Sequence, residues 1–282
     1  MQPIKLIALD LDGTLALPNH QVSPATRSAL HELQRDGVEV VIATGRRYRS
    51  ARYVIDNLGL DSYCVCNGGA LVKDHAQVTL ATTGFNADEY DQIVECAREC
   101  GVVLSAQRDS HHFGGADFVI DSATPWNDMN HEYFNTHAEF AVRGDLLAQR
   151  DQYLIFGAFD TEEKLKRFSR LLLERCDNIN TVTAKIPEHG YLYCEVTVAS
   201  VDKWHGLSSL MSHFKMDGAN ICAVGDELND FAMVQQAGHG IAMGNGHPDL
   251  QAVARYVCGH NDADGLLDAI QYIRDHNEKY GF

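Results

Sequence analysis

Residues 4–14 read IKLIALDLDGT, and the interpretation of the whole chain starts from this segment. Residues 4–9 are apolar apart from Lys5, which predicts a buried β-strand. Two aspartates, a glycine and a threonine follow directly at the carboxyl end of that strand. Asp and Gly are common in turns, so the segment alone fits an ordinary turn as well as a reactive site. The ends of the other strands distinguish these two interpretations.

Short apolar runs alternate with helical patterns on either side of the middle of the chain. Residues 38–43 and 63–66 read as strands, and Ser23-Pro24 marks the capped start of a helix between the first two strands. The same alternation returns near the C-terminus, with strands at 221–224 and 240–243. Strands alternating with helices predict a parallel sheet covered on both faces. We therefore expect an α/β core with a Rossmann-like, doubly wound sheet.

The middle of the chain has a different pattern. Asn86 and Glu89 predict the capped start of a helix, and another helix is expected at 162–175. Strands are expected at 118–121, 153–160 and 191–199. This mixture predicts an inserted α+β domain at residues 84–196. The core domain would then consist of residues 1–83 and 197–282.

Composition and charge exclude several kinds of partner. The 23 Lys and Arg residues are outnumbered by 39 Asp and Glu, which gives a net charge of −16. A surface this acidic disfavours binding to nucleic acid or to an anionic membrane. The N-terminus resembles no secretory signal and no apolar run is long enough to span a membrane, so we expect a cytoplasmic protein.

The 8 cysteines are dispersed, and in the cytosol they would remain thiols. Cys64 and Cys66 lie in an apolar run, which favours a buried strand over a metal site. Cys96 and Cys100 are four residues apart on a predicted helix, but no second pair completes a zinc site. A packed helix face is the better interpretation of that pair.

Polar segments follow the strands of the predicted core. Ligands of open parallel sheets bind at the carboxyl ends of the strands, so these segments should converge on one edge. Unpaired carboxylates repel one another at close range, and oxygen ligands favour Mg²⁺, so a divalent cation is expected among them. The segments are DLDGT at 10–14, TGR at 44–46, NG at 67–68 and GDELND at 225–230.

Four of these features, in order, resemble the motifs of the haloacid dehalogenase-like phosphatases: DLDGT, TGR, Lys203 and GDELND. The large insert between the second and third motifs resembles the Cof-type subfamily, which carries a type II cap. The likeness covers essentially the whole chain. One departure is that Trp204 and His205 follow Lys203, where that subfamily has glycine, which puts the local loop shape in question.

The resemblance implies a reaction and the residues that carry it. Asp10 would be the nucleophile that forms an aspartyl-phosphate, and Asp12 would protonate the leaving alkoxide and later activate water. Mg²⁺ would be held by Asp10, by the backbone carbonyl of Asp12 and by Asp226. Asp230 would orient a metal-bound water or Lys203.

The resemblance also implies a set of phosphate ligands. Thr44 and the backbone N–H groups of Leu11 and Gly45 would hold phosphate oxygens, together with Asn229. Lys203 would neutralise their charge, although an exposed lysine without a function is the commoner fate of this residue type.

Other charged and titratable residues leave more than one interpretation open. Arg46, Arg47 and Arg49 either steer anions or simply begin a solvated helix. The histidines show no ligand spacing and are expected in loops or at the surface, namely His111, His112, His205 and His239.

These observations predict a Mg²⁺-dependent phosphatase acting on small phosphate monoesters, either monomeric or a small homo-oligomer. A phosphomutase and a non-catalytic phosphate-binding module stay open as alternatives. In the resembled family the cap determines specificity, so the sequence leaves sugar phosphates, nucleotides and cofactor phosphates all open as substrates.

Overall fold

The computed structural model describes residues 2–17, 19–110, 115–185 and 191–281. The chain divides into two compact units, which are treated separately below. Unit 1 comprises Met1–Ala81 and Val201–Phe282, and unit 2 comprises Thr82–Ser200. The boundary expected at residue 196 falls inside the strand β11 (Leu192–Val198), because this strand pairs within unit 2 and carries that unit to Ser200.

Unit 1 is built on an eight-stranded sheet with the order β14-β13-β12-β1-β2-β3-β4-β5. Neighbours from β14 to β3 are parallel, and β4 runs antiparallel to β3. The strands are β1 (Leu6–Leu9), β2 (Glu39–Ala43), β3 (Tyr63–Cys66), β4 (Leu71–Lys73), β5 (Thr79–Thr82), β12 (Ile221–Gly225), β13 (His239–Ala242) and β14 (Tyr256–Val257).

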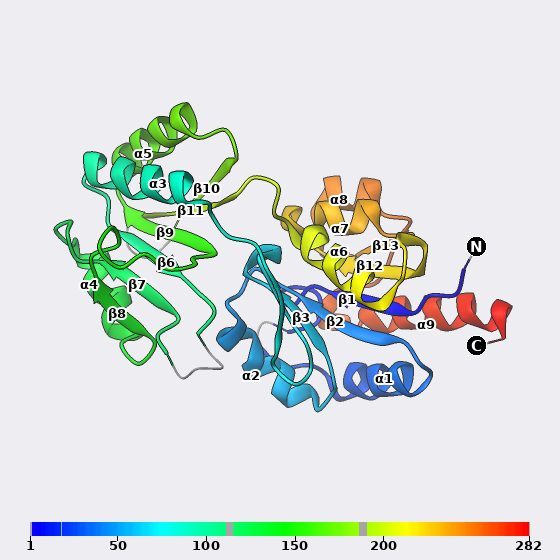
Figure 1. The fold of residues 1–282 in the computed structure, drawn as a ribbon. Coiled ribbons are helices and arrows are strands. Elements are labelled where there is room, and N and C mark those ends of the chain that lie inside the picture. The colour runs from blue at the N-terminus through cyan, green and yellow to red at the C-terminus, as the bar shows by residue number, and fades with distance from the viewer. Residues whose placement is uncertain (1, 18, 111–114, 186–190, 282) are drawn as a thin grey trace. The chain divides into compact units, whose positions relative to one another are not determined.

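Helices cover both faces of this sheet (Figure 1), so the predicted doubly wound α/β core is confirmed. Leu6 and Ala8 of β1 belong to the cluster under α6, α7 and α8, while α1 and α9 pack together on the other face. The helices are α1 (Pro24–Arg35), α2 (Tyr48–Leu58), α6 (Lys203–Phe214), α7 (Phe231–Gln236), α8 (Pro248–Val253) and α9 (Leu266–Asn277).

Unit 2 contains a six-stranded sheet with the order β10-β11-β9-β6-β7-β8. Its neighbours are antiparallel except for β7 and β8. Among its described residues, this α+β unit also contains three α-helices. Its elements are α3 (Ala87–Cys100), β6 (Leu104–Gln107), β7 (Phe118–Asp121), α4 (Asp128–Thr136), β8 (Ala141–Gly144), β9 (Ile155–Asp160), α5 (Glu162–Arg175), β10 (Ile179–Lys185) and β11.

The two faces of this second sheet are packed differently. Helices α3 and α5 cover one face through a core that includes Ile93, Phe156 and Phe168. Helix α4 packs over part of the other face, where Phe118 contacts Tyr133 with ring centroids 5.3 Å apart.

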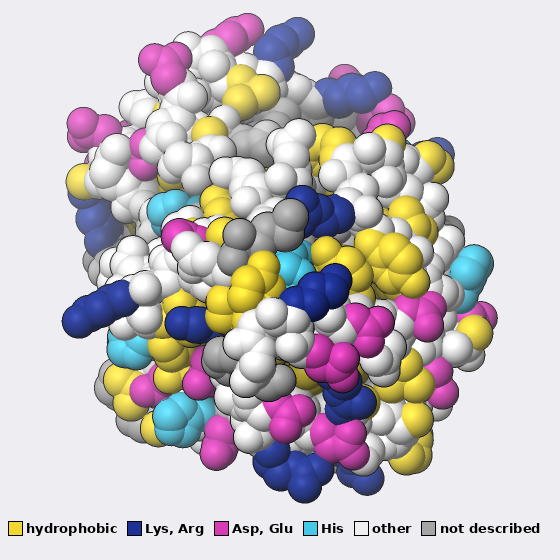
Figure 2. All heavy atoms as spheres, turned by 90° about the vertical axis from the view of Figure 1, so that its right-hand side faces the viewer, with side chains coloured by type: hydrophobic (Ala, Val, Ile, Leu, Met, Phe, Trp, Pro, Cys, Tyr) yellow, Lys and Arg dark blue, Asp and Glu magenta, His cyan; other side chains and the backbone are white. Residues whose placement is uncertain are grey.

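The next features are the cysteines, the charged surface and the length of the apolar helices. All 8 cysteines are buried. As predicted, Cys64 and Cys66 lie in a strand, and Cys96 and Cys100 lie on a packed helix face. On the face shown in Figure 2, basic side chains are interspersed with acidic ones. No helix among the described residues is both long and apolar enough to cross a membrane.

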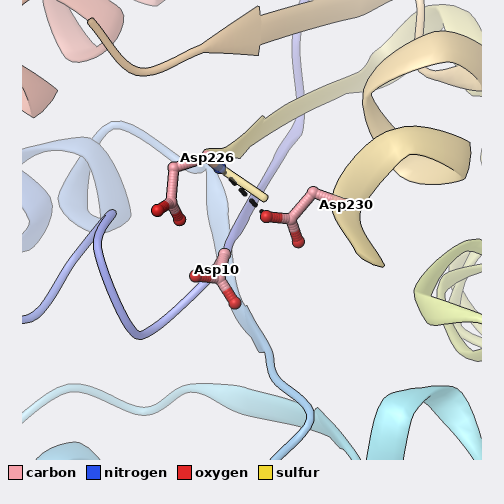
Figure 3. Close-up of side chains that lie close together, drawn as sticks. All are labelled: Asp10, Asp226 and Asp230. Carbon is pink, nitrogen blue, oxygen red and sulfur yellow. Dashed lines mark hydrogen bonds between the residues drawn. The ribbon is translucent and has the colours of Figure 1, made fainter. Parts of the chain in front are cut away.

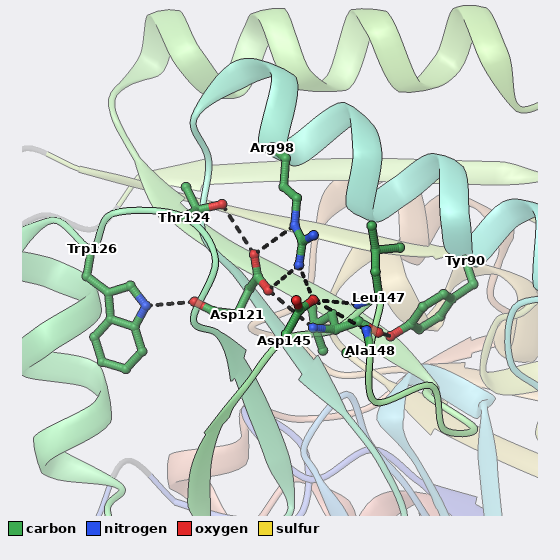
Figure 4. Close-up of polar contacts among 9 residues, drawn as sticks. Tyr90, Arg98, Asp121, Thr124, Trp126, Asp145, Leu147 and Ala148 are labelled. Carbon is green, nitrogen blue, oxygen red and sulfur yellow. Dashed lines mark hydrogen bonds and ion pairs between the residues drawn. The ribbon is translucent and has the colours of Figure 1, made fainter.

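An ion-pair network fixes the loops that follow β7 and β8 (Figure 4). Arg98 of α3 donates to Asp121 at 2.9 Å and to Asp145 at 2.6 Å. Asp121 is 2% exposed and also accepts from the Thr124 hydroxyl at 3.2 Å. The guanidinium therefore supplies the positive charge that a buried carboxylate requires.

We expect Arg98→Met to destabilise unit 2, because it leaves the buried carboxylate of Asp121 without its cation. The loss in unfolding free energy should be on the order of 3 kcal/mol. Each unit has one tryptophan, Trp126 and Trp204. Urea unfolding followed by Trp126 fluorescence in a Trp204→Phe background measures the effect.

The matched control is Lys166→Met, which removes an exposed i,i+4 partner of Glu162. Exposed pairs contribute about 0–1 kcal/mol, so this change should be nearly silent. Equal losses in the two variants would show that the Arg98 network does not hold unit 2 together.

Candidate active site

The first part of the site is the turn that follows β1. Asp10 is 5% exposed, and its N–H donates to Val224 O of β12 at 3.0 Å, which continues the parallel ladder. Gly13 has φ +85°, and a Cβ there would lie 2.2 Å from Asp226 Oδ2. The turn therefore needs glycine both for its backbone conformation and for the close approach of Asp226. This is the physical reason for the glycine in the Asp-x-Asp-Gly pattern.

The second part is the loop after β12, which is closed by Asp230. The Oδ2 atom of Asp230 accepts from the backbone N–H groups of Asp226 at 3.0 Å and Glu227 at 3.1 Å. A Cβ on Gly225 would lie 2.5 Å from Asp230 Cβ, so glycine admits this side chain. Asp230 is fully buried and fixes the position of the Asp226 backbone.

Lys203 lies at the start of α6 and joins the two parts. Its Nζ is 2.5 Å from Asp10 Oδ1 and 2.5 Å from Asp230 Oδ1. Its side chain is 1% exposed, which excludes the interpretation as a solvated surface lysine. Asp202 caps the helix by accepting from the His205 N–H at 2.8 Å, so the departure at Trp204 and His205 leaves a regular helix start.

The protonation of this group is governed by burial. Burial lowers the pKa of Lys203, but the nearby charges of Asp10 and Asp230 outweigh it and raise that pKa. Burial raises the pKa of Asp10 well above its usual range, although Lys203 opposes the effect. Burial also raises the pKa of Asp226 to about 6, against a hydrogen bond from Thr14 at 3.0 Å. Lys203 alone therefore does not supply enough positive charge to offset the burial of these carboxylates.

Oxygen atoms of Asp10, Asp226 and Asp230 all lie within 4.8 Å of one another (Figure 3). Three buried carboxylates with one lysine among them carry excess negative charge. A hard cation with oxygen ligands fits this donor set. Both oxygens of Asp230 already accept hydrogen bonds, from Lys203 and from the backbone, whereas Asp226 presents its carboxylate towards Asp10 and Thr14. Asp10 and Asp226 are therefore the better candidates for direct ligands.

A cavity of about 340 Å³ opens beside Asp10 and brings several predicted phosphate ligands together. It is lined by Asp10, Asp12, Thr44, Gly45, Arg46, Glu227 and Asn229. Thr44 is 1% exposed, and its Oγ1 accepts from the Arg46 N–H at 3.1 Å, which leaves the hydroxyl proton to be donated. A Cβ on Gly45 would lie 3.9 Å from Asn229 Nδ2, so these two segments adjoin. Leu11 is buried in the same turn as Asp10.

The side chain of Arg46 makes specific contacts, so the interpretation of Arg46 as a solvated residue at the start of a helix is incomplete. Its Nε donates to Asp12 Oδ2 at 2.7 Å, and its Nη2 contacts Asp12 Oδ1 and lies 3.0 Å from His20 Nδ1. The side chain of Asp12 is 51% exposed and is not part of the buried cluster of Asp10, Asp226 and Asp230. Arg46 therefore contacts both Asp12 and His20, a grouping that the sequence pattern did not indicate.

One histidine prediction is wrong and one residue of the site was missed. His205 lies in α6 and is partly exposed. His239 is instead a buried residue of β13 that lies 2.9 Å from Tyr272 Oη, because the strand begins one residue earlier than expected. His111 and His112 lie outside the described residues. Glu227 lines the cavity, and its position inside the GDELND segment was the available signal.

This arrangement defines a class of protein: an α/β enzyme with buried carboxylates, a buried lysine and a cavity lined by polar residues at the carboxyl edge of its sheet. Residues 7–270 match the family of haloacid dehalogenase-like hydrolases. The phosphatase YwpJ of Bacillus subtilis is 28% identical, and the match covers 96% of this chain and all of that protein.

Another relative and a solved structure also match over nearly the whole chain. The 5-amino-6-(5-phospho-D-ribitylamino)uracil phosphatase YcsE of Bacillus subtilis is 28% identical, over 95% of each chain. A solved phosphatase of the same superfamily, BT1666 from Bacteroides thetaiotaomicron, shares the fold with a TM-score of 0.78 at 24% identity, over 96% of this chain and 95% of that one. The chain therefore belongs to the haloacid dehalogenase-like hydrolase family, as one of its phosphatases.

The raised pKa of Asp226 predicts a pH-dependent stability. The pKa is about 6 in the folded protein, and that of an aspartate in an unfolded chain is about 4. Between these values the folded metal-free protein binds more protons, so its unfolding free energy should fall as the pH rises from about 4 to 6. Urea unfolding in EDTA measures this slope, and Asp226→Asn should flatten it.

The variant Asn229→Ala is a control in the same loop, because it changes no charge and should keep the slope. Added Mg²⁺ should stabilise the wild type more at pH 7 than at pH 5, since cations bind ionised carboxylates. A slope unchanged by Asp226→Asn would show that this carboxylate is not the group that titrates.

Proposed function

We propose that this protein hydrolyses small phosphate monoesters in a Mg²⁺-dependent reaction, through an aspartyl-phosphate formed on Asp10. The single observation that carries the proposal is the buried contact of Asp10 with Lys203, in a cluster of carboxylates beside a cavity of about 340 Å³. Family membership supports the same reaction type.

Asp10 is proposed as the nucleophile. Its Oδ1 is held by Lys203, and the second oxygen is available to attack phosphorus. A desolvated carboxylate is held by fixed charges and not by mobile water, which lowers the reorganisation needed during attack. Asp230 holds Lys203 from the other side and so positions it for a phosphate oxygen.

The carboxylates of Asp10 and Asp226 and the backbone carbonyl of Asp12 are the proposed ligands of Mg²⁺. The metal would supply charge neutralisation where an anionic nucleophile meets an anionic phosphoryl group. The proposed phosphate ligands are the Thr44 hydroxyl, the N–H groups of Leu11 and Gly45, and the amide of Asn229. Thr44 supports this role because its side-chain oxygen accepts a hydrogen bond from the Arg46 N–H, so that the hydroxyl proton can be donated to a phosphate oxygen.

Asp12 is proposed to protonate the leaving oxygen and then to take a proton from water. Its exposed carboxylate lines the cavity, and Arg46 limits the orientations it can adopt. A proton donor next to the nucleophile favours hydrolysis over mere phosphate binding. Release of phosphate into water, as opposed to its return to a sugar, distinguishes the phosphatase from a phosphomutase.

Unit 2 (Thr82–Ser200), which contains the insert expected at residues 84–196, is proposed to act as the cap that determines which ester is accepted. It lies between the TGR segment and Lys203 in the sequence and contributes none of the described residues of the site. The relative YcsE is named for a phosphorylated ribitylaminouracil, so a small phosphorylated metabolite is the proposed substrate class.

The nucleophile is tested by Asp10→Asn, which keeps the size of the side chain and removes its nucleophilicity. Phosphate release from p-nitrophenyl phosphate should be abolished in this variant and in wild type treated with EDTA, while circular dichroism stays unchanged. When the phosphoenzyme is quenched in acid and reduced with borohydride, the phosphorylated carboxyl group is converted to an alcohol. This modification should be found at Asp10. Modification of another carboxylate, or full activity of the variant, would refute the assignment.

The role of Asp12 is tested by comparing leaving groups. p-Nitrophenolate leaves readily without a proton, whereas an alkoxide gains a factor of about 10²–10⁴ from a positioned general acid. In single-turnover phosphorylation of Asp10, Asp12→Asn should therefore slow an alkyl phosphate far more than p-nitrophenyl phosphate. Glu227→Gln is the matched control, since it alters another carboxylate of the same cavity. Equal slowing of both substrates by Asp12→Asn would exclude proton donation by this residue.

A further inference from the structure

The charged residues that line the cavity beside Asp10 do not balance one another. They are the carboxylates of Asp10, Asp12 and Glu227 and the guanidinium of Arg46. Arg46 donates to both carboxylate oxygens of Asp12, so these two charges offset each other. Asp10 is paired with Lys203 at 2.5 Å. Glu227 is the remaining carboxylate, and none of the described residues forms an ion pair with it.

The buried part of the site balances once a divalent cation is bound. Asp10, Asp226 and Asp230 carry three negative charges, and Lys203 carries one positive charge among them. A Mg²⁺ ion would add the two positive charges that are missing. The exposed carboxylate of Glu227 is therefore the excess negative charge at the cavity.

Glu227 is held in place through its backbone. It directly follows Asp226, and its N–H donates to Asp230 Oδ2 at 3.1 Å. Its carbonyl oxygen accepts from the Asp230 N–H at 2.9 Å. The side chain is exposed, so a carboxylate at this position needs no buried partner. The loop that carries Asp226 thus also fixes a charge at the wall of the cavity.

The position of Glu227 gives its charge access to the substrate. The proposed reaction places the phosphoryl group beside Asp10, and hence the first atoms of the alcohol in or next to the same cavity of about 340 Å³. A charged group on those atoms interacts with Glu227 through Coulomb forces, which attract a cation and repel a second anion. The phosphoryl group is common to all substrates, so Glu227 discriminates by the charge on the alcohol.

We propose that Glu227 determines the charge of the esters that the protein accepts, favouring an alcohol with a cationic group near the phosphate and disfavouring one with a second anionic group. This inference rests on the proposed function. Glu227 acts here by its charge alone, and neither as a proton donor nor as a metal ligand. Because its carboxylate is exposed, the effect is modest in size and weakens as the salt concentration rises.

The test compares wild type with Glu227→Gln on three short esters: 2-aminoethyl phosphate, propyl phosphate and 2-carboxyethyl phosphate. Each ester is compared with itself in the two proteins, so differences in leaving-group reactivity cancel. Glu227→Gln should lower kcat/KM for the amino ester and raise it for the carboxy ester, each by about 3- to 5-fold, the size expected of an exposed ion pair. The uncharged propyl ester should keep its rate.

Two further variants and a binding measurement sharpen the test. Glu227→Lys should move both charged esters further in the same directions. Glu278→Gln removes the same unit of charge from an exposed residue of unit 1 that does not line this cavity, so it should leave all three rates unchanged. Calorimetric titration of the esters into Asp10→Asn, with and without Glu227→Gln, should show the same charge dependence in Kd without turnover.

The inference is overturned if Glu227→Gln changes all three esters by the same factor or changes none of them. It is also overturned if Glu278→Gln has the same effect, because the net charge of the protein would then be responsible. Failure of the proposed function gives a different result, in which the wild type releases phosphate from none of the esters or Asp10→Asn retains full activity. The two ideas are therefore tested separately within one set of measurements.

Discussion

The contact of Lys203 with Asp10 and Asp230 is the interaction on which the site in unit 1 depends. These three buried charged groups come from the end of β1, the start of α6 and the loop after β12. Lys203 Nζ lies 2.5 Å from an oxygen of each aspartate. Removing charged groups from water is costly unless they are paired, so none of the three would be stable there alone. This mutual dependence fixes where the ends of β1 and β12 lie with respect to the start of α6. It also brings together residues that are about 190 positions apart in the chain.

Close packing of backbone and side chains sets a second constraint. Gly13 and Gly225 leave space for the carboxyl groups of Asp226 and Asp230, respectively. The hydrogen bonds from the N–H groups of Asp226 and Glu227 then orient the loop that carries the second carboxylate. Charge pairing and glycine placement therefore act together. The first draws the groups into the interior, and the second allows them to approach.

The sequence predicted the part of the fold that is governed by local patterns. Apolar strands such as β1, and caps such as Ser23 and Asn86, follow from residue type and spacing, and the structure has them. It did not predict α4, β6 or β10, because these elements are short or exposed and are defined by pairing with distant strands. The sequence also predicted that the carboxylates of the core lie at one edge of the sheet, because the carboxyl ends of parallel strands lie at the same edge.

The same reasoning explains why the Arg46–Asp12 contact and the grouping of Ser105, Gly157 and Glu195 in unit 2 could not be predicted. Arg46 could equally have faced solvent, and only tertiary structure brings its guanidinium to Asp12. Ser105, Gly157 and Glu195 lie on three strands and become neighbours only through the register of an antiparallel sheet. A one-residue shift in either pairing would turn these side chains into the hydrophobic core. The residues clustered in unit 1 can therefore be inferred from motifs in the chain, whereas the grouping of Ser105, Gly157 and Glu195 in unit 2 depends on strand register, which no local motif encodes.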